Sequence, residues 1–480
     1  MSKKGSKKGG GEGSKSEQIS EPTLQAVLLI DCYNLYFSPL SSNYPLCLFP
    51  VANEPILSYT LYFLRSAGIQ ELLIVGKHCS KELGEFIKNF MLIQKGAKLS
   101  IHSLFSETCD SLGSCLKHVH SSQLIHSDFV LLYGCVISNV DVLEIIKEHR
   151  TRTKNNPGSM MTMVFQRGAP QQRGRTQEND LALMISQNEK QLLFYQKTGY
   201  RNKLKFPLDK ILSHNSVELH YDIQETCLFI CSPQVPQLFS ENFDYQTIED
   251  FINGILVDEE LLSNQIHTHI LDGRCYLSSA STPLAYHCIN TDAMERWTYP
   301  YVPDSNLKLS PGDKYEYSRR NIYIGTCVTL ERGSRLEVNV VIGKLCHIHS
   351  GASITHSVLG DNVVVGEHVK IEDSYIWSNV TIHDNCTITG CIIANDVIIK
   401  SRCSIGSSSF ISRGLTIGPD IKLSPGTRLI QRIEPIQTHD ELSSSDRTPT
   451  LGSDFTPLFT HSLAQDIVNI GKYLIYTQTT

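Results

Sequence analysis

The sequence predicts an α/β domain with a largely parallel sheet, followed by a left-handed parallel β-helix. Three observations support this fold class. At 480 residues the chain is too long for one ordinary domain. Short apolar runs alternate with amphipathic stretches from Leu24 to about residue 300. After Asn321, branched aliphatic residues recur with a period of six.

Composition indicates a soluble globular protein of a reducing compartment. Hydrophobic residues make up 41% of the chain and charged residues 19%. The net charge of −6 is too small to favour nucleic-acid or membrane binding. The first twenty residues contain no apolar signal segment, and no apolar run is long enough to span a membrane. The 15 cysteines include no C-x-x-C pair, so we expect buried thiols, no metal site and a cytosolic location.

Residues 1–23 form a tail rich in Lys, Gly and Ser, which is predicted to be disordered because it has little apolar surface to bury. The α/β domain is predicted over residues 24–300. Its strands are expected at the runs LQAVLLI, ELLIV, DFVLLYG, MMTMVF, LLFYQ and TCLFIC. Helices are expected over residues 54–67, over SKELGEFIKNFML with a cap at Ser80, and around VLEIIKEH.

A linker over residues 301–320 precedes the β-helix, which is predicted over residues 321–430. An α-helix cannot keep one face buried with a strict period of six, whereas a triangular coil of three short strands can. About six coils are expected. The positions predicted to point inward are Ile324, Leu330, Leu336, Ile342, Ile348, Ile354, Leu359, Val365, Ile371, Ile376, Ile382, Ile388, Ile393, Ile399, Ile405, Ile411, Ile417, Leu423 and Leu429.

Residues 431–480 are predicted to be a tail that is partly disordered, because much of it is rich in Ser and Thr. Within this tail, the stretch HSLAQDIVNIGKYLIY could form one amphipathic helix.

The segment from Leu28 to Leu57 has the layout of a phosphate-binding loop between a strand and a helix, yet it contains no Gly, Lys or Arg. It ends in LFPVANEP. Together with the two-domain layout, this segment resembles the sugar-nucleotide pyrophosphorylases, whose loop has a Gly-rich turn with Arg, a Pro-Lys pair and LLPVANKP. In this chain DCYNLYF, residues 31–37, replaces the glycine turn, and Pro45-Leu46 replaces Pro-Lys. We therefore expect no bound nucleotide.

The metal site of that family also lacks its ligand here. Where the family has a Gly-Asp that holds Mg²⁺, this chain has Cys135 in the run LLYGCVISN. A thiol is a poor ligand for a hard cation that prefers oxygen. We therefore predict no catalytic residue, no cofactor and no metal in this domain.

Three longer stretches resemble the epsilon-subunit family of eukaryotic translation initiation factor 2B. They run from Ile230 to Ile270, from Met294 to Asn306, and over NIYIG from Asn321. The resemblance implies a subunit of a guanine-nucleotide exchange factor that pairs with the gamma and other subunits and contacts the GTPase of initiation factor 2. No direct nucleic-acid partner is expected. The alternative is an active sugar-nucleotide pyrophosphorylase of the mannose-1-phosphate guanylyltransferase type.

Asn242 and Phe243 are the candidate site residues. They correspond to the Asn-Phe pair that the epsilon family uses at the GTPase contact. An exposed Phe beside an amide is typical of an interface anchor, whereas a Phe at the start of a helix can equally belong to the core. The residues alone leave both interpretations open, and the resemblance favours the contact.

Two further expectations concern the second half of the chain. In the epsilon family, exchange belongs to a HEAT-type helical domain after the β-helix, and the 51 residues that follow Leu429 cannot supply such a domain. Exchange by this chain alone is therefore not expected. Hexapeptide β-helices also occur in acyltransferases with a catalytic histidine, but here the histidines are expected to be surface residues. They are His347, His349, His356, His368 and His383.

Overall fold

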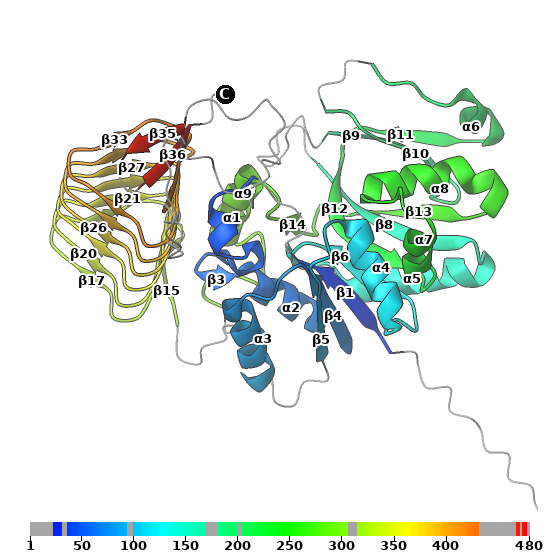
Figure 1. Cartoon of the computed structure of the whole chain (residues 1–480), viewed down its shortest axis with the longest axis horizontal. Helices are drawn as coiled ribbons and strands as arrows, with labels where there is room; N and C mark the ends of the chain where they lie inside the picture. The colour runs from blue at the N-terminus through cyan, green and yellow to red at the C-terminus, as the bar shows by residue number, and fades with distance from the viewer. Residues whose placement is uncertain are drawn as a thin grey trace, which may run out of the picture.

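The computed structural model describes residues 23–30, 36–93, 99–168, 180–199, 203–305, 314–431, 467–470 and 473–477. These residues form an α/β part and a β-helix that lies against one end of it (Figure 1). Both parts of the predicted fold class are confirmed. The predicted disorder of residues 1–22 and 432–466 lies outside the described ranges.

The α/β part is built on a seven-stranded sheet with the order β13-β8-β12-β6-β1-β4-β5. Four neighbouring pairs are parallel, and β12 is antiparallel to both β6 and β8. Its strands are β1 (Gln25–Leu29), β4 (Glu71–Gly76), β5 (Ser100–Phe105), β6 (Phe129–Tyr133), β8 (Ser159–Arg167), β12 (Ile223–Cys231) and β13 (Gln265–Leu271).

Helices cover both faces of this sheet, as crossovers between parallel strands require. Ala26 and Leu28 of β1 pack in one core with α2, α3, α5 and α9. Val27 and Leu29 pack in a second core with α4, α7 and α8. The helices are α2 (Ile56–Ser66), α3 (Lys81–Ile93), α4 (Leu112–Ser122), α5 (Val142–Asn155), α7 (Val235–Glu241), α8 (Ile248–Leu262) and α9 (Pro283–Met294).

Local sequence signals account for several of these elements. The predicted cap at Ser80 is confirmed, because its Oγ accepts a hydrogen bond of 3.1 Å from Leu83 N at the start of α3. Ser111 and Ser114 form a capping box at α4. The run LLFYQ lies in β10 (Leu192–Lys197), which belongs to a separate antiparallel sheet. That sheet has the order β10-β9-β11 and also contains β9 (Leu181–Ser186) and β11 (Val217–His220). The short helix α6 (Leu208–Ser213) precedes β11 along the chain.

Short elements complete the α/β part. They are α1 (Leu40–Asn43), the 3₁₀ turn Leu46–Leu48, the pair β2 (Pro50–Val51) and β3 (Glu54–Pro55), and the pair β7 (Val136–Ser138) and β14 (Leu277–Ser279). The segment predicted as a linker contains β15 (Glu316–Ser318), which pairs antiparallel with the first strand of the β-helix.

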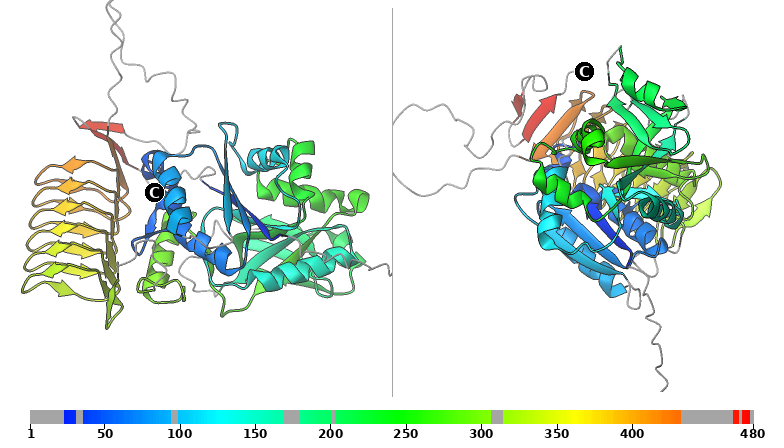
Figure 2. Two further views of the ribbon diagram at one scale, coloured as in Figure 1. Left: turned by 90° about the horizontal axis from the view of Figure 1, so that it is seen from below. Right: turned by 90° about the vertical axis from the view of Figure 1, so that its right-hand side faces the viewer.

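The β-helix has one parallel sheet on each side of a triangular coil (Figure 2). The side nearest the α/β part contains β16 (Ile322–Ile324), β19 (Val340–Ile342), β22 (Ser357–Leu359), β25 (Tyr375–Ile376), β28 (Ile392–Ile393), β31 (Phe410–Ile411) and β34 (Thr427–Gln431). The second contains β17 (Thr329–Leu330), β20 (His347–Ile348), β23 (Val364–Val365), β26 (Thr381–Ile382), β29 (Ile398–Ile399) and β32 (Thr416–Ile417). The third contains β18 (Arg335–Leu336), β21 (Ser353–Thr355), β24 (Lys370–Glu372), β27 (Thr387–Thr389), β30 (Ser404–Ile405) and β33 (Lys422–Leu423).

The predicted inward positions form the core of the β-helix. From Ile342 to Ile417 every one of them is buried. Leu330 is 41% exposed, because no coil lies beneath the first one to cover it. Many corners use residues with positive φ, among them Asn339, Asn362 and Asn379, since Asn tolerates the left-handed conformation better than most residues.

The α/β part and the β-helix share one hydrophobic core. The outward residues of the nearest side of the β-helix are apolar and belong to the same cluster as α2 and α9. They are Tyr323, Val341, Val358, Tyr375, Ile392 and Phe410. The two parts are therefore joined through packed side chains as well as through the chain itself.

The expectation of a helix within residues 461–476 is wrong where the structure describes this segment. It contains β35 (Ile467–Ile470) and the start of β36 (Tyr473–Thr477). β36 pairs antiparallel with β34, the strand of the last coil. It lies along the outer edge of β34, whose backbone groups can form hydrogen bonds with a strand but not with a helix.

Within the described residues, no helix is long and apolar enough to cross a membrane. No group of three or more His, Cys, Asp or Glu side chains in these ranges is arranged to hold a metal ion.

Candidate functional site

The loop that follows β1 packs against the β-helix. We call its described part, residues 36–55, the first loop. Phe37 is fully buried, and its ring centre lies 5.3 Å from that of Phe49, 6.0 Å from that of Tyr286 and 6.4 Å from that of Phe410. Phe410 belongs to β31 of the β-helix. Tyr36, the other described residue of the run 31–37, is exposed, and residues 31–35 lie outside the described residues.

Further along the first loop, other side chains and a backbone group extend this contact. The ring centres of Tyr44 and Phe49 lie 5.5 Å and 4.9 Å from that of Trp377. Arg428 donates a hydrogen bond of 2.8 Å to the carbonyl of Ser38. Aromatic rings and the half-buried side chain of Arg428 therefore hold residues 37–49 of the first loop on the β-helix.

The LFPVANEP turn is also anchored outside the sheet. Ala52 and Asn53 both have positive φ. The side chain of Asn53 donates to the carbonyl of Leu359 in the β-helix at 2.6 Å, and to the hydroxyl of Tyr315 at 3.1 Å. Ala52 N donates to Asn290 Oδ1 of α9 at 3.0 Å. The motif that resembles a nucleotide signature thus serves here as a joint between the two parts.

Two small cavities border the described part of the first loop. Among the described residues, a cavity of about 20 Å³ lies beside Ala52 and Glu54, and one of about 10 Å³ lies beside Leu40 and Tyr44. A single water needs about 10 to 15 Å³ measured in this way, so neither cavity can admit a nucleoside. Cys135 is half-buried and packs against the core that contains the first loop.

Phe243 lies on the surface, at a different place on the same domain. It belongs to residues 242–247, which connect α7 to α8 and which we call the display loop. Its side chain is 77% exposed, so it does not belong to the core. Asn242 ends α7, and its Oδ1 accepts a hydrogen bond of 2.9 Å from Asp244 N. The structure therefore places both candidate residues in one turn, with the amide bracing the backbone and the ring facing solvent.

Contacts with α7 and α8 and a hydrogen bond within the loop hold the display loop in place. Tyr245 is buried, and its ring makes edge contacts with Phe239 of α7 and Phe251 of α8, which stack on each other. The side chain of Gln246 donates to the carbonyl of Phe243 at 2.6 Å. An exposed aromatic ring on a braced loop loses little entropy on binding, which is the property of an interface anchor.

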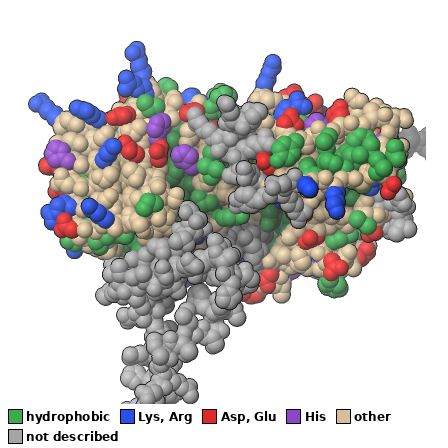
Figure 3. Space-filling model, turned by 90° about the horizontal axis from the view of Figure 1, so that it is seen from above, with side chains coloured by type: hydrophobic (Ala, Val, Ile, Leu, Met, Phe, Trp, Pro, Cys, Tyr) green, Lys and Arg blue, Asp and Glu red, His purple; other side chains and the backbone are tan. Residues whose placement is uncertain are grey.

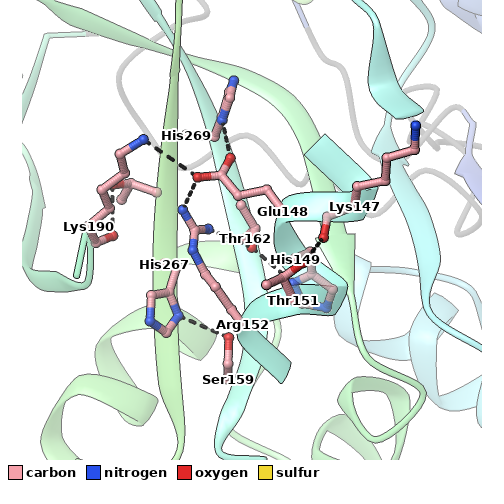
Figure 4. Close-up of polar contacts among 11 residues, drawn as sticks. Lys147, Glu148, His149, Thr151, Arg152, Ser159, Thr162, Lys190, His267 and His269 are labelled. Atoms are coloured by element: carbon pink, nitrogen blue, oxygen red, sulfur yellow. Dashed lines mark hydrogen bonds and ion pairs between the residues drawn. The ribbon is translucent and has the colours of Figure 1, made fainter. Parts of the chain in front are cut away.

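A polar network that the sequence analysis did not anticipate lies between α5, β8 and β13 (Figure 4). Glu148 is bonded to Arg152, one turn along α5, and its second oxygen lies 2.7 Å from His269 Nδ1. Lys190 Nζ lies 3.5 Å from the same carboxylate. The hydrogen bond with His269 and the nearby positive charges lower the pKa of Glu148 to about 2, against the opposing effect of burial.

Two buried histidines flank this network. His149 Nδ1 lies 2.9 Å from Thr162 Oγ1, and His267 Nδ1 lies 3.0 Å from Ser159 Oγ. Burial lowers the pKa of each histidine to about 4, with the charge of Arg152 acting in the same direction. Both are therefore neutral at neutral pH.

The five histidines of the β-helix do not gather into a site. His347, His368 and His383 are exposed, His356 is half-buried, and His349 Nδ1 lies 3.0 Å from Glu331 Oε1. These positions lie on different strands or corners of the coil, as expected for surface residues.

Comparisons with known proteins agree with this geometry. The family model described as the "EIF2B subunit epsilon LbH domain" matches residues 319–423. The chain is 34% identical to translation initiation factor eIF2B subunit epsilon of Schizosaccharomyces pombe over 409 residues, which cover 85% of this chain and 59% of that protein. It is 32% identical to the subunit of the same name from Dictyostelium discoideum over 345 residues, covering 72% and 48%.

A more distant similarity involves an enzyme. The chain is 24% identical to CTP:phosphoglutamine cytidylyltransferase of Campylobacter jejuni over 126 residues, which cover 25% of this chain and 50% of that protein. The alignments with the two epsilon subunits are much longer and closer. The chain spans about half the length of those subunits.

Proposed function

The chain is homologous to the epsilon subunits of translation initiation factor eIF2B, and on this premise we propose that it serves as an epsilon-type subunit of that guanine-nucleotide exchange factor. In this role its α/β part is a contact surface for the GTPase of initiation factor 2, and its β-helix is a scaffold. The observation that carries this proposal is the exposed Phe243 on its braced display loop.

The same proposal assigns no nucleotidyltransferase activity to the chain. A nucleotide needs backbone amides or cations near its phosphates, and the described part of the first loop offers aromatic rings that are already packed against Phe410 and Trp377. Cys135 stands where the resembled enzymes carry the aspartate that binds their metal. The alternative of a sugar-nucleotide pyrophosphorylase therefore has no supporting observation in the site.

The proposed GTPase contact consists of Asn242 and Phe243. Truncation of Phe243 to Ala removes the anchor but leaves its brace, since Tyr245 and the amide of Asn242 are untouched. We expect the free energy of association with the GTPase to weaken by about 1 to 3 kcal/mol, which is an increase in Kd of roughly five- to 150-fold.

Isothermal titration of the GTPase into the purified full chain tests this expectation. Leu212→Ala is a matched control, because Leu212 is a similarly exposed apolar residue on α6, away from the display loop. The proposal predicts weaker binding for Phe243→Ala alone, with thermal stability near that of the parent chain. Equal affinities for the parent chain and Phe243→Ala would refute the contact.

Association with gamma-type subunits is supported by a separate apolar face. Exposed apolar side chains gather at the end of the α/β part that is distant from the β-helix (Figure 3). In the described residues, β11 pairs only with β9, so one of its edges is open. Of the elements at this end (Figure 1), α6, β11 and α8 carry the exposed residues Leu208, Leu212, Leu219 and Val257. A patch of this kind on a surface typically marks an interface with another protein.

Leu212→Lys is expected to weaken assembly with the gamma subunit, because it places a charge within that face. Thr381→Lys, on the solvent side of the β-helix, is the control. Size-exclusion chromatography of the mixed subunits checks this prediction. Unchanged assembly of the Leu212→Lys chain would show that the gamma subunit binds elsewhere.

A further inference from the structure

The N-terminal half of α4 lies directly beside the display loop. Lys117 Nζ is 4.5 Å from the centre of the Phe243 ring, within the range of a cation–π contact. Among the described ion pairs none involves Lys117. The acidic groups of the neighbouring residues, Glu241, Asp244 and Asp250, do not pair with it within the described residues either.

Hydrogen bonds join the start of α4 to the display loop. Ser111 Oγ donates to Gln246 Oε1 at 2.6 Å, and Gly113 N donates to the carbonyl of Gln246 at 3.1 Å. Since Gln246 in turn donates to the carbonyl of Phe243, the backbone that carries the ring is tied to the helix that carries Lys117.

Two glycines make this close approach possible. A Cβ at Gly113 would lie 2.0 Å from the carbonyl oxygen of Tyr245, and a Cβ at Gly254 would lie 2.4 Å from the Tyr245 ring. Tyr245 is therefore wedged between α4 and α8, with its backbone against one glycine and its ring against the other. Any larger residue at either position must displace the display loop.

We propose that α4 and the display loop form one preorganised contact surface, in which Lys117 is a contact residue and Tyr245 positions Phe243. This inference rests on the proposed function. The partner suited to such a surface has an apolar pocket for the open face of Phe243 and a carboxylate beside it for the Lys117 ammonium. Lys117 places a positive charge over one face of the Phe243 ring, so it selects between partners by charge while Phe243 supplies the buried area.

Lys117 is tested by two substitutions in the full chain. Lys117→Met keeps an apolar cover over the ring but removes the charge, whereas Lys117→Arg keeps both. We expect Lys117→Met to weaken binding of the initiation-factor-2 GTPase about three- to tenfold and to reduce the dependence of Kd on salt. Lys117→Arg should bind nearly as well as the parent chain.

The positioning role of Tyr245 is tested by Gly254→Ala, with Gly84→Ala in α3 as the matched control. A Cβ at Gly84 would meet only Cys79 Sγ at 3.6 Å, an ordinary contact. We expect faster amide hydrogen exchange in residues 242–247 and weaker GTPase binding for Gly254→Ala alone. Melting temperatures for both variants separate this local effect from general destabilisation.

The outcomes distinguish this inference from the proposed function. If Phe243→Ala leaves GTPase binding unchanged, the proposed contact itself is wrong. If Phe243→Ala weakens binding while Lys117→Met matches the parent chain at every salt concentration, the contact stands and the role of α4 is refuted. If Gly254→Ala leaves both exchange and binding unchanged, Tyr245 does not position the display loop.

Discussion

At the scale of single residues, burial and neighbouring charges set the protonation states in the network around Glu148. Glu148 is ionised because His269, Arg152 and Lys190 surround it, whereas His149 and His267 are neutral because they are buried near Arg152. This arrangement could not be predicted from the sequence, because Glu148 and His269 are 121 positions apart. The packing of α5 on β8 and the parallel pairing of β8 with β13 bring them together.

The network predicts acid sensitivity. The pKa of each histidine is about 4 in the folded chain and about 6.5 when unfolded, so the unfolded chain binds more protons between these values. The stabilising contribution is fully present above pH 6.5 and is lost as pH falls towards 4, by roughly 2 to 3 kcal/mol per histidine. Below about pH 4.5, protonation of Glu148 adds to this loss until pH 2.

Urea denaturation at pH 7.5, 6 and 5 measures this effect. His149→Gln removes one titrating group and should give a shallower loss of stability than the parent chain over this interval. Identical pH dependence in both chains would show that His149 titrates normally.

At the scale of elements, the hexapeptide repeat could be predicted from the sequence in detail, because each coil repeats the same burial pattern. What could not be predicted was which outward side faces the α/β part. The signal was present, since Tyr323, Val341 and Phe410 are apolar at outward positions. Each such outward residue stands directly beside an inward aliphatic residue. The stronger inward repeat therefore conceals the outward one.

A pair of neighbouring substitutions tests the register of the coils. Ile382 is 1% exposed and lies between Val365 and Ile399 of the adjoining coils. Ile382→Asp buries a carboxylate without a partner, so we expect the free energy of unfolding to fall by several kcal/mol. Thr381→Asp on the outward side should change it little. Thermal denaturation compares the two, and equal damage would place the register off by one residue.

For the candidate site, the identity of Asn242 and Phe243 came from a resemblance, and their geometry came from the structure. Sequence alone could not separate an exposed Phe from a core Phe at a helix start. The deciding feature is Tyr245, which fills the core position two residues later and leaves Phe243 outside. Lys117 could not be anticipated either, because it is more than a hundred residues away along the chain.

At the scale of the whole molecule, the α/β part and the β-helix behave as one packed unit. The core around the first loop includes residues from both, and Asn53 adds a polar link to Leu359. The described part of the loop that resembles a phosphate-binding loop therefore packs as a joint between the two parts.

This coupling predicts cooperative unfolding. Phe410→Ala removes a buried ring that stacks on Phe37, at a cost of about 3 kcal/mol. Calorimetry should show the single transition of the parent chain broaden or split as the joint weakens. Ile398→Ala, at an exposed position on another side of the β-helix, should leave the transition unchanged. Separate transitions already present in the parent chain would contradict a shared core.

We propose that this nucleotidyltransferase-like fold serves as a protein contact and does not bind a nucleotide. The most direct test of this proposal is isothermal titration of the purified full chain with GTP and with ATP, each in the presence of Mg²⁺. We expect no saturable heat at micromolar nucleotide, because Phe37 and Phe49 of the first loop pack against the β-helix and because Cys135 stands at the position of the metal ligand in the resembled enzymes. Saturable binding that depends on Mg²⁺, with a micromolar Kd, would contradict it.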